Sequence, residues 1–509
     1  MNRLLFFIAA WFWVVSAAYA QNVAPNVEAI RQDLIMLTSD EHGGRGTGDT
    51  GFLAAANYVA NQLLELGFHS FNSQNQPAEK AEDFFHQVPL IKEKLISVEL
   101  QTGKKNWKYG KDFYTNRAFG SDAIYSDSLS FVAYDQLGQL LPAQLQNQVV
   151  VIWRQKVEKA KRSPSIREIA RSLNRFSPQA ILVIDAEFPS QPTLITNALA
   201  AENICIDYSR DREYGVSPTA GRTIPIIIVS EKVGRKMFKS AGLDWKKSWA
   251  GTGQTSSQPI VRQAFKLKAK ATVISEPFEA PNVAGLLPGK KNSEEYIVLS
   301  AHLDHLGIHD GKIYYGADDN GSGSAALLEM SRLLFAYRDQ GNLPDKTIVF
   351  LWLTGEEHGL LGSQYFTSFP PVPLESIKVN LNVDMIGRVD KAHLNEPNYV
   401  YLIGSDRLSS DLHRISEEVN ASCCGINFDY TYNDPNDPNR YYQRSDHYNF
   451  AKYGIPVIFY FSGVHEDYHK PSDTPDKIDY NRIARIANLI FLTAYELANR
   501  EEALLIDKQ

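Results

Sequence analysis

Hydrophobic and polar positions follow two alternating patterns along the second half of the chain. Short, continuous apolar runs predict buried strands, whereas apolar residues spaced three and four positions apart predict helices. The strand-like runs cover residues 296–300, 347–353, 377–383 and 457–461, and the helix-like stretches cover residues 324–337, 408–419 and 481–499. Strands that alternate with helices predict an α/β fold whose mostly parallel central sheet is covered by helices on both faces.

Two earlier regions depart from this pattern. Residues 27–66 have the apolar spacing of helices, interrupted by a turn-rich stretch at residues 39–48 and ended by Gly67. From about residue 126 to residue 253 the chain consists of short β-branched runs, separated by helix-like stretches. The β-branched runs lie at residues 148–153, 180–184 and 224–229. This change predicts a separate, smaller module of β-rich or α/β type.

The first twenty residues have the pattern of a leader. One basic residue, Arg3, precedes an apolar run at residues 4–15, and Ala18-Tyr19-Ala20 follows that run. The run is shorter than the roughly 20 residues that cross a bilayer as a helix. We therefore predict a signal peptide at residues 1–20 that is removed after Ala20, and export to the periplasm or the extracellular space. No later segment is long and apolar enough to predict a membrane anchor.

Composition excludes several classes of protein. The 509 residues are 44% hydrophobic and 22% charged, which is ordinary for globular proteins and not for disordered, collagen-like or coiled-coil chains. The chain has 52 basic and 59 acidic side chains, a net charge of −7, and no block of like charges. We therefore expect no nucleic-acid partner and no binding to anionic membranes.

The three cysteines are too few for a disulfide framework. Cys423 and Cys424 are neighbours, so one interpretation is a disulfide between them, with Cys205 left over. The other interpretation is that all three are small buried side chains. The sequence leaves both open.

Side chains that can bind a metal follow the predicted strands at the points where the strands end. They are His302, Asp304, His305, Asp318, Asp319, Glu356, Glu357, Asp384, His465 and His469. They form five groups along the chain, at residues 302–305, 318–319, 356–357, 384 and 465–469. Each group alone has an ordinary explanation, such as a turn or the N-cap of a helix. In a parallel sheet, however, ligands collect at the carboxyl ends of the strands. The convergence of five such groups at one edge therefore predicts a metal site.

The segment from His465 to His469 also matches H-E-x-x-H, the zinc motif of another class of protease. That motif works only on a helix, where both histidines lie on one face. Gly463 precedes the segment, and Pro471 and Pro475 follow it, so little room is left for a helix. We therefore reject this interpretation and take His469 as the better ligand candidate.

Over residues 295–475 these motifs together resemble metallopeptidase family 28, the co-catalytic zinc aminopeptidases related to glutamate carboxypeptidase II and transferrin receptor. The resemblance rests on His302-x-Asp304, Gly316-Ala-Asp-Asp319-Asn-Gly-Ser-Gly, Glu356-Glu357-x-Gly-Leu-x-Gly-Ser363, Asp384-Met-Ile-Gly and His469-x-x-x-Asp473-Thr474. The segment at residues 37–48 is similar to the opening segment of the family. The middle module resembles the protease-associated (PA) domain that family members often carry as an insert. This resemblance rests on the alternation of strand-like and helix-like stretches and on the place of the module in the chain.

The resemblance implies a zinc exopeptidase fold with four parts. They are the signal peptide at residues 1–20, an N-terminal segment of the peptidase domain at 21–115, a PA-like insert at 116–265, and the catalytic di-zinc domain at 266–509.

The resemblance also implies a role for each site residue. His302 and Asp384 would bind one of two Zn²⁺ ions, Glu357 and His469 the other, and Asp319 would link the two. Glu356 would be the catalytic general base, and Asp304 would orient the His302 ring. Family members often use a tyrosine hydroxyl to stabilise the oxyanion, and Tyr441, Tyr442 and Tyr468 all stay open for this role. The triplet Ser445-Asp446-His447 is similar to a segment near the family's pocket and receives no role here.

The predicted function is an exported, zinc-dependent aminopeptidase that hydrolyses the N-terminal residues of peptides. Two alternatives on the same fold are a carboxypeptidase or dipeptidase, which needs a basic pocket for the substrate carboxylate, and a glutaminyl cyclase. A third is a non-catalytic, receptor-like binding protein, against which the complete set of ligands and the general base argue.

Overall fold

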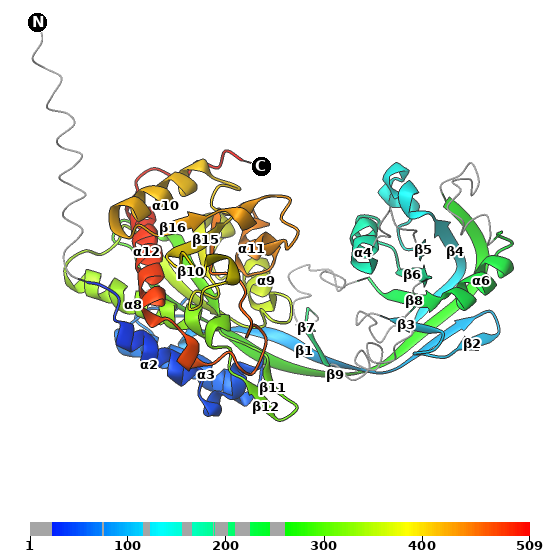
Figure 1. Cartoon of the computed structure of the whole chain (residues 1–509), viewed down its shortest axis with the longest axis horizontal. Helices are drawn as coiled ribbons and strands as arrows, with labels where there is room; N and C mark the ends of the chain where they lie inside the picture. The colour runs from blue at the N-terminus through cyan, green and yellow to red at the C-terminus, as the bar shows by residue number, and fades with distance from the viewer. Residues whose placement is uncertain are drawn as a thin grey trace, which may run out of the picture. The chain divides into compact units, whose positions relative to one another are not determined.

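The computed structural model describes residues 23–73, 76–115, 123–154, 165–186, 188, 202–208, 224–244 and 260–508. The predicted signal peptide lies outside these ranges. The chain forms two compact units, a larger one of Met1–Pro89 with Glu279–Gln509 and a smaller one of Leu90–Phe278 (Figure 1). The chain passes between the two units within β1 (Phe85–Thr102) and β9 (Ile260–Leu287).

The larger unit is built on a mixed, mostly parallel sheet. Its strands lie in the order β16-β15-β17-β14-β10-β13-β9. Besides β9 they are β10 (Asn292–His302), β13 (Lys346–Leu353), β14 (Ile377–Val383), β15 (Tyr399–Ile403), β16 (Asn427–Asp429) and β17 (Val457–Phe461). Only the pairs β13–β9 and β15–β17 are antiparallel among these described strands. The predicted α/β fold with a mostly parallel sheet is confirmed.

Helices lie on both faces of this sheet (Figure 1). One layer contains α2 (Val27–Leu37), α3 (Thr50–Leu66), α8 (Gly323–Asp339), α10 (Ser410–Cys423) and α12 (Tyr480–Asn499), and the other contains α9 (Leu361–Ser368) and α11 (His447–Ala451). Side chains of β13 alternate between the layers, as the period of a strand requires. Val349 and Leu351 pack with α9 and α11, whereas Trp352 donates a hydrogen bond to the Ser324 carbonyl of α8.

The helices that the sequence predicts are present, with shifted ends. The stretch predicted at 408–419 forms α10, which continues to Cys423. Residues 27–66 divide into α2 and α3, and α3 ends at Gly67, whose φ of 80° suits the left-handed end of a helix. The short helices α9 and α11 were not predicted, because five to eight residues are too few to show a period.

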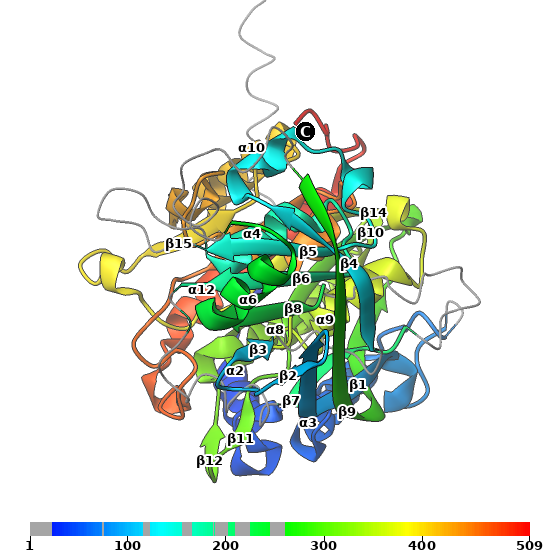
Figure 2. The same cartoon turned by 90° about the vertical axis from the view of Figure 1, so that its right-hand side faces the viewer.

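The smaller unit contains its own α/β layer. Strands β4 (Ile124–Val132), β5 (Val149–Arg154), β6 (Ala180–Asp185) and β8 (Ile226–Ser230) run parallel, and β3 (Phe113–Thr115) and β9 are antiparallel neighbours at the two ends (Figure 2). Alternate residues of β5 and β6 pack against α4 (Ile166–Asn174) on one face and α6 (Glu231–Ser240) on the other. Strand β1 also pairs with β2 (Lys105–Trp107) and β7 (Glu202–Ile206). The identification of residues 116–265 as a PA-like insert stays a prediction.

Two smaller findings bear on the sequence analysis. Cys423 and Cys424 form a disulfide at the end of α10, so the first of the two interpretations holds for this pair. Within the described ranges, no helix combines the length and apolarity that a membrane crossing requires.

Candidate metal centre

The predicted site residues come together at the carboxyl edge of the parallel strands. His302 ends β10, Glu356 and Glu357 follow β13, Asp384 follows β14, and His469 lies in the loop after β17. Asp319 lies in the segment just before α8. The fold thus brings together side chains that are up to 167 positions apart in the sequence (His302 to His469).

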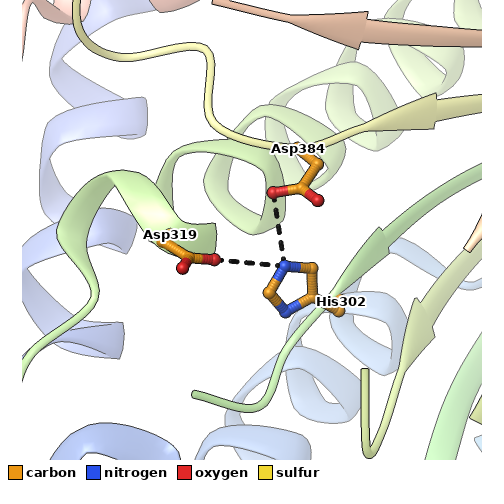
Figure 3. Close-up of side chains that lie close together, drawn as sticks. All are labelled: His302, Asp319 and Asp384. Carbon is orange, nitrogen blue, oxygen red and sulfur yellow. Dashed lines mark hydrogen bonds and ion pairs between the residues drawn. The ribbon is translucent and has the colours of Figure 1, made fainter. Parts of the chain in front are cut away.

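The first group consists of His302, Asp319 and Asp384 (Figure 3). The imidazole Nε2 of His302 lies 3.3 Å from Asp319 Oδ1 and 3.3 Å from Asp384 Oδ1. The other nitrogen, Nδ1, lies 3.0 Å from the carbonyl oxygen of Asp304. A carbonyl only accepts, so Nδ1 donates to it, and Nε2 is the ring nitrogen directed at the two carboxylates.

The second group consists of Asp319, Glu357 and His469. His469 Nε2 lies 3.1 Å from Asp319 Oδ2 and 3.1 Å from Glu357 Oε2. Asp319 therefore directs its two oxygens to different groups, Oδ1 to the first and Oδ2 to the second. His305 also lies here, with Nδ1 2.8 Å from Glu357 Oε1.

The donor set and its spacing fit two zinc ions. Imidazole nitrogens and carboxylate oxygens are the donors that zinc accepts, with bonds of about 2.0–2.2 Å. Two ligands of a tetrahedral ion with such bonds lie roughly 3.3 Å apart. The distances of 3.1 to 3.3 Å within each group agree with this spacing.

Charge in the site also favours a bound cation. Burial opposes ionisation of Asp319, but His305, His302 and His469 outweigh it and hold the pKa of its carboxyl group well below the ordinary value. For Glu356, burial raises the pKa of the carboxyl group well above the ordinary value. The negative charges of Glu357 and Asp384 raise this pKa further, and His302 lowers it only in part. Four carboxyl groups that share one partly closed site are better balanced by cations than by water.

Asp304 connects three segments behind the first group. Its carboxylate accepts hydrogen bonds from the Thr47 hydroxyl at 2.8 Å and from the Glu356 backbone N–H at 3.1 Å. The contact with the His302 ring is made by the Asp304 carbonyl oxygen at 3.0 Å, whereas the nearer carboxylate oxygen lies 3.9 Å from that ring nitrogen. Asp304 thus fixes the positions of His302 and Glu356 together.

Arg45 supports the site from the N-terminal segment. Its side chain is fully buried and donates to the carbonyl oxygens of Leu37, Leu303, Tyr315 and Gly316 at 2.8 to 2.9 Å. Burial lowers the pKa of its guanidinium to about 10, so the group stays charged at neutral pH. Sequence motifs indicated that residues 37–48 belong to the domain, but they did not indicate this anchoring contact.

Two more polar clusters lie behind the ligands and were not assigned from the sequence. The Ser445 hydroxyl donates to Asp384 Oδ2 at 2.8 Å and accepts from Asn382. His465 pairs with Asp318 at 3.2 Å, and segment 465–469 forms turns rather than a helix, so the rejection of the H-E-x-x-H interpretation is confirmed. The polar triplet at residues 445–447 was the available signal, but only folding brings Ser445 to Asp384.

Among the three tyrosines left open, Tyr468 lies nearest to the site. Its ring stacks on the His469 ring with centroids 3.9 Å apart. Burial raises the pKa of its hydroxyl, and the negative charges of Asp319, Glu357 and Glu356 raise it further. Tyr441 and Tyr442 instead pack in an aromatic cluster with partners such as Phe461 and His447.

His447 gives a prediction about stability. Its imidazole is fully buried and stacks on the Phe459 ring. Burial lowers the pKa of this imidazole to about 3, although a backbone hydrogen bond at Tyr442 acts in the opposite direction. The unfolded chain binds a proton below pH 6.5, and the folded chain does not until about pH 3, so stability falls as pH decreases between these values. From pH 7.5 to pH 5 we expect this group alone to cost about 2 kcal/mol.

The measurement is chemical denaturation of the wild type and of His447→Phe at both pH values. The variant should lose about 2 kcal/mol less than the wild type over this interval. The matched control is His309→Phe at an exposed position, which should keep the wild-type pH dependence. Equal pH dependence in His447→Phe and the wild type would contradict the assignment.

An α/β sheet whose strand ends bring together two histidine–carboxylate groups that share one aspartate is typical of a metal-dependent enzyme. The family model for Peptidase family M28 matches residues 282–494. A probable leucine aminopeptidase from Arthroderma otae is 33% identical over 262 residues, which cover 49% of this chain and 68% of that protein. A probable leucine aminopeptidase from Trichophyton verrucosum is 28% identical over 326 residues, covering 60% of this chain and 84% of that protein.

The solved structure of the aminopeptidase from Aneurinibacillus sp. strain AM-1 shares the fold. Its TM-score is 0.52 at 16% identity, covering 96% of this chain and 97% of that chain. The chain belongs to peptidase family M28 and is a metallopeptidase. The family resemblance read from the motifs is confirmed, and membership supports zinc as the metal.

Proposed function

We propose that this enzyme is a di-zinc aminopeptidase that removes N-terminal residues from peptides. The observation that carries the proposal is the orientation of Asp319, whose Oδ1 faces His302 and whose Oδ2 faces His469. One carboxylate between two donor groups suits a pair of ions that share it. In this proposal His302 and Asp384 hold one ion, Glu357 and His469 hold the other, and Asp319 links them.

When bound, the two zinc ions supply Lewis-acid activation of a water molecule and of the peptide carbonyl. Glu356 is proposed to accept the proton of that water and to pass it to the leaving amine. Burial raises the pKa of its carboxyl group above the ordinary value, which favours a group that takes up a proton during the reaction. Its backbone N–H, bound to Asp304, keeps the residue beside His302. The Tyr468 hydroxyl is the proposed donor to the oxyanion.

The exposure of the ligands supports one direction of substrate entry. The His469 side chain is 36% exposed, whereas those of His302, Asp319, Glu357 and Asp384 are 11% exposed or less. A peptide is therefore expected to approach beside His469 and Tyr468. The relatives named leucine aminopeptidase support cleavage at the N-terminal end of the peptide.

The test uses aminoacyl reporters with a free and with an N-acetylated amine, together with metal analysis. We expect cleavage of the free reporter alone, loss of activity on chelation, and two zinc ions per chain. Equal cleavage of both reporters would contradict the aminopeptidase proposal and favour another peptidase activity on this fold. Fewer than two ions per chain after zinc saturation would sink the shared-site proposal.

Export and the domain insert are part of the proposal. The leader pattern at residues 1–20 supports export, and N-terminal sequencing of the mature enzyme should then begin at Gln21.

A PA-like insert at residues 116–265 is supported by the smaller unit, which interrupts the larger one between Pro89 and Glu279. Limited proteolysis should release a stable fragment from this unit, and its rapid complete degradation would count against a separate domain.

A further inference from the structure

His305 lies in the site but is absent from the set of ligands that the motifs imply. Its side chain is fully buried, and its Nδ1 lies 2.8 Å from Glu357 Oε1. The same nitrogen lies 3.7 Å from Asp319 Oδ2, which is too far for a hydrogen bond. The short contact of this ring is therefore with Glu357.

The geometry of this contact separates His305 from His469. Nε2 of His469 lies 3.1 Å from an oxygen of Asp319 and 3.1 Å from an oxygen of Glu357, as two ligands of one ion would, whereas Nδ1 of His305 is within hydrogen-bond distance of Glu357 alone. In that contact the His305 ring donates and the Glu357 carboxylate accepts. The other nitrogen, Nε2, is buried and has no hydrogen-bond partner among the described residues. His305 thus differs from His302, whose Nε2 faces two carboxylate oxygens.

The surrounding chain holds the ring in this position. The backbone N–H of His305 donates to the Arg45 carbonyl at 3.0 Å. A Cβ atom at Gly316 would lie 2.5 Å from two carbon atoms of the ring, so the absence of a side chain there leaves room for the imidazole. The contact with Glu357 is therefore set by two other segments of the chain.

The two oxygens of Glu357 have separate partners as a result. Oε1 accepts from His305, and Oε2 lies 3.1 Å from His469 Nε2. With Oε1 occupied, the carboxylate cannot rotate freely, and Oε2 stays directed toward His469. A fixed carboxylate loses less freedom when it binds an ion, so the ion binds more tightly.

We propose that His305 is a positioning residue for the second zinc ion, acting through its hydrogen bond to Glu357. This inference rests on the proposed two-zinc function. Loss of such a partner typically weakens metal binding by about 10-fold to 100-fold. The affinity of the ion held by Glu357 and His469 should therefore depend on an N–H donor at the position of His305 Nδ1, and the other ion should not.

The test compares three variants with the wild type. His305→Asn keeps an N–H near the position of Nδ1, His305→Gln moves its amide toward the position of Nε2, and His305→Leu has no donor. Zinc affinity is measured by competition with a coloured chelator, and Co²⁺ absorption spectra report the ligands of each ion. We expect His305→Leu and His305→Gln to bind the second ion about 10-fold to 100-fold more weakly, and His305→Asn to stay within about threefold of the wild type.

Two results would overturn the inference. If all three variants lose the second ion and its Co²⁺ spectrum equally, His305 is a direct ligand. If all three keep wild-type affinities, the ring only fills space. A wild type that binds fewer than two ions would instead contradict the proposed function, so the two failures are distinguishable.

Discussion

Glu356→Gln is expected to lower kcat by about 100-fold to 10,000-fold while both zinc ions stay bound. Glutamine has the shape of glutamate, but its amide does not accept a proton near neutral pH. The hydrogen bond from the backbone of this residue to Asp304 is unchanged by the substitution. Zinc content should stay at the wild-type value, because the Glu356 carboxyl group belongs to neither ligand group. The measurements are kcat on a free aminoacyl reporter and metal analysis of the same sample.

Glu396→Gln is the matched control for this experiment. It makes the same chemical change at an exposed position, and we expect wild-type kcat. Two results would count against Glu356 as the general base. One is a variant that keeps more than about a tenth of wild-type kcat, which is less loss than removal of a general base causes. The other is loss of zinc from the variant, which would make Glu356 a ligand.

Asp319→Asn is expected to remove zinc and activity together. Asparagine has one carbonyl oxygen and one NH₂ group, and only the oxygen can bind a metal ion. The variant can therefore supply a ligand atom to one of the two ions and not to both. The substitution also removes the negative charge that this side chain would offer to both ions. We expect at most one zinc ion per chain under conditions that saturate the wild type. We also expect kcat/KM to fall on the order of 1,000-fold, as loss of several kcal/mol of metal catalysis implies.

Asp310→Asn provides the matched control. Asp310 is exposed, and its φ of 51° is one that asparagine adopts readily, so neither zinc content nor activity should change. Zinc and kcat/KM are measured on both variants after the same dialysis. Two bound ions in Asp319→Asn would show that the ions do not depend on a shared carboxylate.

The location of the site could be predicted from the sequence because parallel strands impose it. Each apolar run ends at the same edge of the sheet, so residues that directly follow the runs must be neighbours. His302, Glu357 and Asp384 obey this rule, and their distances to shared partners are between 3.1 and 3.3 Å. The fold class followed from the same alternation of strands and helices.

Contacts behind the ligands could not be predicted in this way. Arg45 reaches Leu303 across 258 positions of the chain and Gly316 across 271, and Ser445 reaches Asp384 across 61. No local pattern encodes such contacts, because they depend on how whole helices and loops pack on the sheet. The choice of Tyr468 over Tyr441 likewise needed the stacking of its ring on His469.

The amino-acid sequence by itself determined an α/β fold with metal donors at the strand ends, and the resemblance of its motifs to a known family indicated a metallopeptidase. Periodicity and chain order suffice for the fold and for the place of the donors, since they act through local backbone geometry and the edge of one sheet. Only the tertiary structure decided how each donor is used. In the folded chain the two oxygens of Asp319 contact different histidines. Asp318 pairs with His465, and His305 forms a hydrogen bond with Glu357. These choices depend on contacts between side chains from distant segments, which no spacing along the chain specifies.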